Sequence, residues 1–538
     1  MRHFWTITIL LPVMLILPAT SVRAQLADLA FVETRAEATD FIETTRYDEL
    51  MNFVDVVVAN SDRLFRTTFG YTTEGRALPL VVFGDVRSAA PADVRRVEKT
   101  RVFIMANIHG GEVEGKEASL MMLRAMAEGR YDRMLDSLVI LVAPIYNADG
   151  NEAIALDNRG PQHGPLGGMG TRANARGYNL NRDHTKVDAP ETRGLIALLR
   201  DYDPHVVVDL HATNGTHHGY HLTYAPPLNP NTSAGIIDLL RGDWLPTMTE
   251  RIKGQYDIDT YYYGNLPWPG QDLPRGWYTF DYRPRFNNNY VGLRNRPAIL
   301  SEAYAYLPFR ERVDITRIFV DEILQYAQEN AEAIRVVAAE SDAEEIVGTE
   351  MALRATYEQS PEPVEILMGD VAEEIHPFTG DIIYRRLDVR RPEEMFEHGA
   401  FTPTETERVP EAYLIPGHLV HVLEALSLHG IGYEQIGRED TLEVERFRID
   451  ESRTAEREFE RHHMREVEGD YERLRMAIPA GWYRVDMHQP LARLAFVLLE
   501  PRSDDGLLAW NKLDDEIEGQ AYYPLLRVTA EVGHGTSP

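Results

Sequence analysis

The strongest constraint on the fold is an alternation of short apolar runs with helical patterns between residues 41 and 340. Residues 101–108 (RVFIMANI) and 138–146 (LVILVAPIY) have the length and apolar content of buried strands, and residues 114–127 follow the first run with the spacing of an amphipathic helix. Strands that alternate with helices are typical of an α/β domain. We therefore predict a mixed, mostly parallel central sheet flanked by helices, with further elements at residues 191–200, 205–210, 297–302 and 314–337.

Residues 341–538 differ from the preceding region in composition and in the pattern of apolar residues. Residues 341–363 are acidic and contain proline, so we expect a linker there. Short extended runs dominate residues 364–538, which predicts a smaller β-rich accessory domain with one charged helix near residues 451–475. We expect no catalytic group from this C-terminal region.

The N-terminus has the composition of a targeting segment. Arg2 precedes an apolar run at residues 4–18, and the small residues Val22 and Ala24 fit the positions before a signal-peptidase cut. The run is shorter than the ~20 apolar residues that a membrane span needs. We therefore predict a signal peptide at residues 1–24, a secreted or periplasmic mature protein, and no membrane span after cleavage.

Charge and cysteine content exclude several classes of function. Asp and Glu number 85 against 55 Lys and Arg, a formal net charge of -30, and no long basic run is present. A nucleic-acid partner would normally require clustered basic charge, so none is expected. The chain has no cysteine, so a metal would have to be held by His, Asp or Glu.

Three side chains at the predicted strand ends have the chemistry of metal ligands. His109 and Glu112 are three residues apart at a strand-to-helix turn, and His211 follows directly after the strand expected at 205–210. Taken alone, the first pair is better explained by a helix start with an N-terminal acid, and His211 could be a core histidine. Taken together, two His and one Glu form an open three-ligand set of the kind that binds zinc. Asp209, on the same side of the strand, could orient the neighbouring groups.

Two further groups are candidates for chemistry. Residues 172–183 combine arginines with asparagines, and guanidinium groups bind carboxylates and stabilise oxyanions. A solvated basic loop would explain the same residues. Glu302 ends an apolar strand, where desolvation should raise its pKa and make it a general base, although it could be an ordinary strand-end carboxylate. Residues 261–263 with Trp268 could form an aromatic substrate wall or pack in the core.

These motifs together resemble the M14 zinc carboxypeptidases over roughly residues 45–335. The resemblance begins at residues 69–76 (FGYTTEGR), continues through the metal-ligand pair, and includes residues 147–150 (NADG), where Ala148 replaces the usual proline. Arg172, residues 180–182, the second histidine and Glu302 then follow in the family's order.

The resemblance implies a secreted metallocarboxypeptidase that hydrolyses C-terminal peptide bonds of peptides with a free carboxylate. One Zn²⁺ would be bound by His109, Glu112 and His211. Arg172 would stabilise the oxyanion, and Asn181 and Arg182 would hold the terminal carboxylate. Glu302 would activate the zinc-bound water and then protonate the leaving amine.

Three alternatives remain open from the sequence. The family uses a mobile tyrosine upstream of the glutamate, and Tyr278, Tyr282 and Tyr290 are candidates, with Tyr290 favoured because residues 287–292 read as a flexible loop. The enzyme could instead be an amidohydrolase of the same fold acting on cell-wall peptides or acyl-amino acids. A catalytically silent binding protein on the same scaffold is the third alternative.

Overall fold

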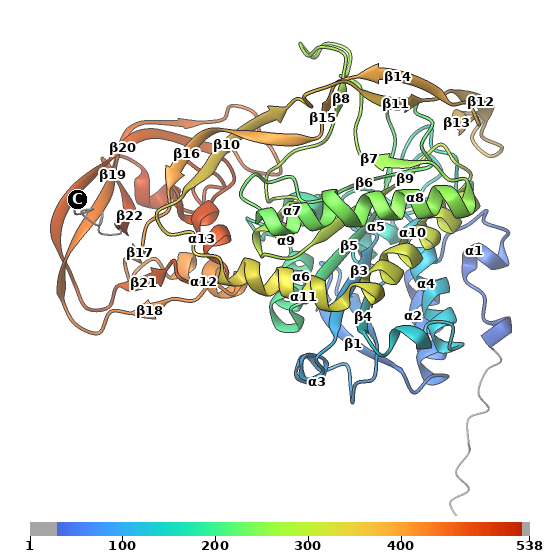
Figure 1. Cartoon of the computed structure of the whole chain (residues 1–538), viewed down its shortest axis with the longest axis horizontal. Coiled ribbons are helices and arrows are strands. Elements are labelled where there is room, and N and C mark those ends of the chain that lie inside the picture. Colours follow the sequence, from blue (N-terminus) through green and yellow to red (C-terminus); the bar gives the residue numbers. More distant parts are fainter. Residues whose placement is uncertain (1–28, 530–538) are drawn as a thin grey trace, which may run out of the picture.

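The computed structural model describes residues 29–529, so the predicted signal peptide lies outside the described residues (Figure 1). The core of the N-terminal region is an eight-stranded sheet in the order β1-β2-β4-β3-β5-β9-β6-β7. The strands span β1 Leu64–Tyr71, β2 Ala77–Phe83, β3 Thr100–Ala106, β4 Leu138–Ala143, β5 Val206–Thr213, β6 Leu222–Ala225, β7 Thr260–Tyr262 and β9 Ala298–Tyr304.

The centre of this sheet is parallel, the margin at β1 is antiparallel, and the last pair at the other margin, β6–β7, is again parallel. Strand β3 pairs in parallel with β4 and β5, and β5 with β9, whereas β1–β2, β2–β4 and β6–β9 are antiparallel. Every residue of β3, β4 and β5 is buried, which is why these strands are continuous apolar runs rather than alternating ones. The predicted mixed α/β fold is confirmed.

Helices flank this sheet and pack on one another. Helix α4 (Glu114–Ala127) contacts α2 (Tyr47–Ala59) and α10 (Phe309–Glu329), while α6 (Pro190–Tyr202) packs against β1. Among the described helices, none combines the length and apolar character that crossing a bilayer requires.

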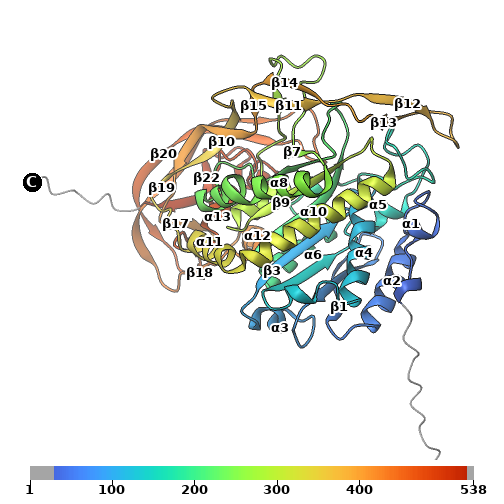
Figure 2. The same ribbon diagram turned by 45° about the vertical axis from the view of Figure 1, so that its right-hand side comes forward.

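The C-terminal region is β-rich, as predicted. A six-stranded sheet has the order β18-β21-β17-β22-β19-β20, and two short antiparallel strand pairs, β11–β14 and β12–β13, extend as a narrow arm along the N-terminal region (Figures 1 and 2). The bounds are β10 Glu350–Glu358, β11 Val364–Met368, β12 Val371–Ile375, β13 Ile382–Arg386, β14 Arg391–Met395, β16 Ala400–Arg408, β17 Ala412–Ile415, β18 Glu434–Gln435, β19 Asp440–Thr454, β20 Arg465–Ile478, β21 Tyr483–Asp486 and β22 Tyr522–Val528.

The prediction of a charged helix near residues 451–475 is wrong. These residues form the end of β19, a turn and most of β20, two long antiparallel strands. Their charges pair across the hairpin: Arg448 Nη1 lies 2.8 Å from Glu472 Oε1. Charged residues on the exposed face of a strand therefore resembled the solvated face of a helix.

The boundary between the two regions is structured. Helix α11 (Ala331–Ala343) runs into the segment expected to be a linker, and β10 lies within it and pairs with β16. Strand β15 (Glu397–His398) also pairs in parallel with β8 (Trp277–Tyr278) of the N-terminal region. Backbone hydrogen bonds thus join the two parts of the chain, and the division at 341–363 stays a prediction.

Candidate active site

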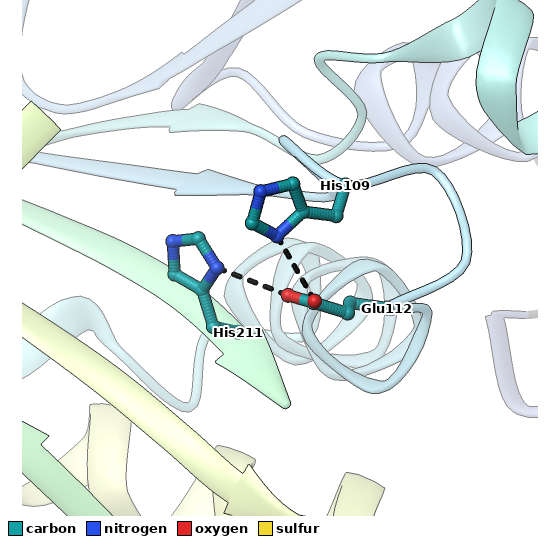
Figure 3. Close-up of side chains that lie close together, drawn as sticks. All are labelled: His109, Glu112 and His211. Carbon is teal, nitrogen blue, oxygen red and sulfur yellow. Dashed lines mark hydrogen bonds and ion pairs between the residues drawn. The ribbon is translucent and has the colours of Figure 1, made fainter. Parts of the chain in front are cut away.

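Three buried side chains converge at the carboxyl edge of the parallel strands. His109 and Glu112 lie in the turn between β3 and α4, and His211 lies on β5 (Figure 3). His109 Nδ1 is 2.9 Å from Glu112 Oε1, and His211 Nδ1 is 3.0 Å from Glu112 Oε2. One donor atom from each residue lies within 4.8 Å of the others, so the three could hold one metal ion.

The turn that carries the first two side chains requires its glycines. A Cβ on Gly110 would lie 2.3 Å from the carbonyl carbon of Gly150, and one on Gly111 would lie 2.4 Å from the oxygen of Gly170. Contacts this short exclude any side chain. Asn107, at φ 66°, donates its amide to the carbonyl oxygens of His109, Gly110 and Glu112 and so fixes the turn.

The outward-facing nitrogens of both histidines meet oxygen atoms. His109 Nε2 is 3.1 Å from Asn179 Oδ1, and His211 Nε2 is 3.0 Å from Asp209 Oδ2. Asp209 also accepts a hydrogen bond from Asn287. Partners of this kind hold the ring orientation and leave both Nδ1 atoms for a metal.

Burial and charge set the protonation of these groups. Burial lowers the pKa of His109 to about 3, which favours the neutral form that binds metal. Burial also acts to lower the pKa of His211, but the carboxylates of Asp209 and Glu112 outweigh it and raise that pKa. A metal ion would therefore have to displace a proton from His211, which makes metal affinity depend on pH.

Glu302 lies beside this group on β9, directly opposite His211 in the β5–β9 register. Its Oε2 atom is buried and has no hydrogen-bond partner within the described part of the chain. Burial raises the pKa of Glu302 to about 8, against the opposing effect of His211. A cation held by the neighbouring ligands would favour the ionised form of Glu302, and its unused oxygen could then accept and return a proton.

The arginine loop faces the same space. Arg172 Nη1 lies 3.3 Å from His109 Nδ1 and 3.6 Å from Glu112 Oε1. The guanidinium of Arg182 stacks 3.6 Å above the ring of Phe286, and burial lowers its pKa to about 9. One cavity of about 450 Å³ thus brings together every site residue that the sequence predicted: His109, Glu112, Arg172, Asn181, Arg182, His211 and Glu302.

Sequence reasoning missed Arg159, which also lines this cavity. Its Nη2 is 2.7 Å from Glu112 Oε1, and its own backbone is left-handed at φ 69°. The residue lies in an irregular segment between β4 and the arginine loop, and no local pattern marks it. The signal that could have found it is a lone arginine next to Gly160 in a glycine-rich stretch.

None of the three candidate tyrosines lines the cavity, and the flexible loop expected at residues 287–292 is instead the buried helix α9 (Asn287–Leu293). Tyr290 is fully buried, with its hydroxyl 2.8 Å from His429 Nδ1, so the preference for Tyr290 is wrong. Tyr263 and Trp268, from the aromatic run, do line the cavity. Burial raises the pKa of Tyr263 to about 12, so its hydroxyl stays protonated at neutral pH.

The fold and the open His–Glu–His set together define a metal-dependent hydrolase of the α/β class. Residues 50–232 match the family model described as zinc carboxypeptidase. Over this segment the chain is similar to the zinc carboxypeptidases. The matched segment contains all three candidate ligands and the arginine loop, whereas Glu302 lies beyond it.

Known proteins show how far the likeness extends. Carboxypeptidase 2 of Trichophyton tonsurans is 24% identical over 477 residues, covering 85% of this chain and 81% of the relative. Carboxypeptidase 2 of Trichophyton rubrum is 24% identical over 476 residues, with the same coverage of both chains. Among solved structures, a metallo-carboxypeptidase from Burkholderia cenocepacia aligns with a TM-score of 0.40 at 16% identity, covering 53% of this chain and 69% of that one.

Proposed function

We propose that this chain is a secreted zinc carboxypeptidase that removes C-terminal residues from peptides with a free carboxylate. One observation carries the proposal: a single cavity contains a three-ligand metal set, a carboxylate oxygen with no partner in the described part of the chain, and three guanidinium groups. These are the groups needed to hold a terminal carboxylate and to hydrolyse the bond beside it.

The donor set fits one zinc ion. Two imidazole nitrogens and one carboxylate are common zinc ligands, and three protein ligands leave a position open for chemistry. Zn²⁺ bound by His109, Glu112 and His211 would act as a Lewis acid and lower the pKa of a water molecule.

The protein's own groups have distinct tasks in the proposed reaction. Glu302 accepts a proton from the attacking water and delivers it to the leaving amine, because its Oε2 atom has no competing partner. Arg172 donates to the oxygen that becomes negative in the transition state. Asn181 and Arg182 bind the terminal carboxylate, which places the last peptide bond beside Glu302.

The cavity favours apolar side chains at the end of the substrate. Among the described residues that line it, the acids are Glu112 and Glu302, and both have tasks of their own in the proposed reaction, so neither is free to pair with a basic residue. Aromatic and aliphatic groups line much of the rest: Tyr263, Trp268, Phe280, Phe286 and Leu300. We therefore expect peptides that end in Phe or Leu to be cleaved with a higher kcat/KM than peptides that end in Lys or Arg.

The test uses the purified mature protein and matched peptides with a free or an amidated C-terminus. We expect about one zinc per chain, turnover of the free acid only, loss of turnover with a chelator and recovery with Zn²⁺. Turnover of acyl-amino acids but not of peptides would favour the amidohydrolase alternative. Zinc binding without any turnover would favour the silent binding protein.

Export is a separate part of the proposal and rests on the sequence of residues 1–24. N-terminal sequencing of the exported protein should begin at Gln25. A mature chain that retains the apolar run at residues 4–18 would contradict it.

A further inference from the structure

We propose that the tip of the β19–β20 hairpin, residues 455–464, positions the substrate-binding loop of the active site, with Glu460 as its main contact. The inference builds on the proposed function and assigns the C-terminal region a specific task. Glu460 is a positioning residue: it acts through Asn179 on the candidate metal ligand His109.

The tip is a tight two-residue turn with unusual residues. Phe459 and His462 exchange backbone hydrogen bonds of 2.8 and 3.0 Å, which leaves Glu460 and Arg461 as the two central residues. Both have left-handed backbones, at φ 50° and 67°. Turns of this geometry favour Asn and Gly at these places, because other side chains are strained there. Two charged residues in strained backbone positions indicate that the contacts of their side chains offset the cost of the backbone strain.

Glu460 connects the tip to the metal site in two steps. Its Oε2 atom accepts a hydrogen bond of 3.2 Å from the backbone N–H of Asn179. The side-chain oxygen of Asn179 then lies 3.1 Å from His109 Nε2 and accepts from the N–H of Asn181, also at 3.1 Å. Holding the backbone of Asn179 therefore fixes both a metal-ligand ring and a substrate-binding amide.

Arg461 and His462 fasten the same loop at two more points. The guanidinium of Arg461 donates to the carbonyl oxygen of Arg176 and lies 4.9 Å from the ring centre of Tyr178. His462 Nε2 lies 2.8 Å from Asp188 Oδ2. The tip thus contacts the loop before, within and after the segment that carries Asn181.

The loop needs such an anchor because it has little regular structure of its own. Within the described residues 172–188, the only helix or strand is the three-residue turn Leu180–Arg182. A loop without a ladder of backbone hydrogen bonds depends on tertiary contacts for its order. Arg172, Asn179, Asn181 and Arg182 all lie on it, so loosening the loop would disturb metal orientation and carboxylate binding together.

The experiment compares Glu460→Ala and Glu460→Gln in the full mature chain with Glu458→Ala as the control. Glu458 is on the same tip, is exposed, and makes no hydrogen bond or ion pair within the described part of the chain. Zinc affinity is measured by competition with a chelator. The values of kcat and KM are measured with a free-acid peptide, and Tm is measured by circular dichroism.

We expect Glu460→Ala to weaken zinc affinity and raise KM by about tenfold each, the lower end of what loss of an outer partner of a metal ligand costs. Glu460→Gln should stay within about twofold of wild type, because its amide oxygen can still accept from Asn179. Tm should be the same in all variants. Equal zinc affinity and KM in Glu460→Ala and Glu458→Ala would overturn the proposal, as would a Gln variant as impaired as Ala. The zinc measurement needs no turnover, so it tests the tip even if the wild-type protein cleaves no peptide.

Discussion

The unpartnered oxygen of Glu302 leads to the sharpest prediction at the scale of single residues. Glu302→Gln keeps the size of the side chain and removes the base. We expect zinc content and Tm to match wild type and kcat to fall by at least ~10²-fold, the usual range for loss of a general base. Near-normal hydrolysis by the zinc-loaded variant would show that another group takes the proton. His211→Ala is the matched comparison and should lose metal as well as activity.

The two arginines of the loop should separate kinetically. In the proposed mechanism Arg172, 3.6 Å from Glu112, stabilises the developing negative charge, so Arg172→Ala should lower kcat by about 10²–10³-fold. The proposed role of Arg182 is to hold the ground-state carboxylate, so Arg182→Ala should mainly raise KM. Steady-state kinetics with one free-acid peptide distinguishes the two. Unchanged kinetics in both variants would mean that the loop does not contact substrate.

At the scale of helices and strands, the sequence predicted those elements whose formation depends on a local pattern of residues. The buried strands and the residues at their ends follow from apolar runs and turn chemistry, which is why His109, Glu112 and Glu302 could be placed in advance. The β19–β20 hairpin was misjudged because its stability comes from pairing between segments rather than from its own spacing. The helix at Asn287–Leu293 was missed because asparagine favours loops, and only tertiary contacts such as that between Asn287 and Asp209 override that preference.

The contact between α9 and α12 (Val420–His429) predicts sensitivity to acid. Burial, helped by the charge of Arg294, lowers the pKa of His429 to about 3. The unfolded chain has an ordinary histidine pKa near ~6.5, so it takes up the proton first as the pH falls. The stabilisation by neutral His429 is therefore complete above about pH 6.5 and is lost progressively toward pH 3.

Urea unfolding at several pH values measures this effect. His429→Gln should flatten the dependence of the unfolding free energy on pH between 6 and 4 by up to ~1.4 kcal/mol per pH unit, the value for one proton. His418→Gln, at an exposed position, is the control and should leave the slope unchanged. An equal slope in wild type and His429→Gln would show that His429 is not the group being protonated.

At the scale of the whole molecule, backbone pairing and a buried ion pair join the two regions that the sequence separates. Strand β15 extends the catalytic region at β8, and the guanidinium of Arg285 is buried against Asp505, with Nε 2.8 Å from Oδ1. The sequence shows that the pattern of residues changes along the chain. It does not show contacts between residues as far apart as Arg285 and Asp505, which are separated by 220 positions.

Breaking this buried pair should destabilise the whole protein. Asp505→Ala leaves the guanidinium of Arg285 buried without its carboxylate, which typically costs about 3–5 kcal/mol. Asp515→Ala removes an exposed acid from the same region and should change the unfolding free energy by less than ~0.5 kcal/mol. Chemical denaturation followed by tryptophan fluorescence compares the two. Equal midpoints would mean that the pair of Arg285 and Asp505 does not stabilise the protein.

The charges of β20 have a consequence for association between molecules. In the described structure β20 ends the six-stranded sheet, and its outer row of backbone N–H and C=O groups has no strand beside it; the N–H of Arg465, which donates to the carbonyl oxygen of Ala509, is the exception at its first residue. Such an open margin can recruit a strand from another chain and start aggregation. A second copy would bring the same Arg and Glu side chains against themselves, and the cost of desolvating them opposes that pairing. The charged residues that made this strand resemble a helix in the sequence thus protect the folded protein from adding strands at its exposed margin.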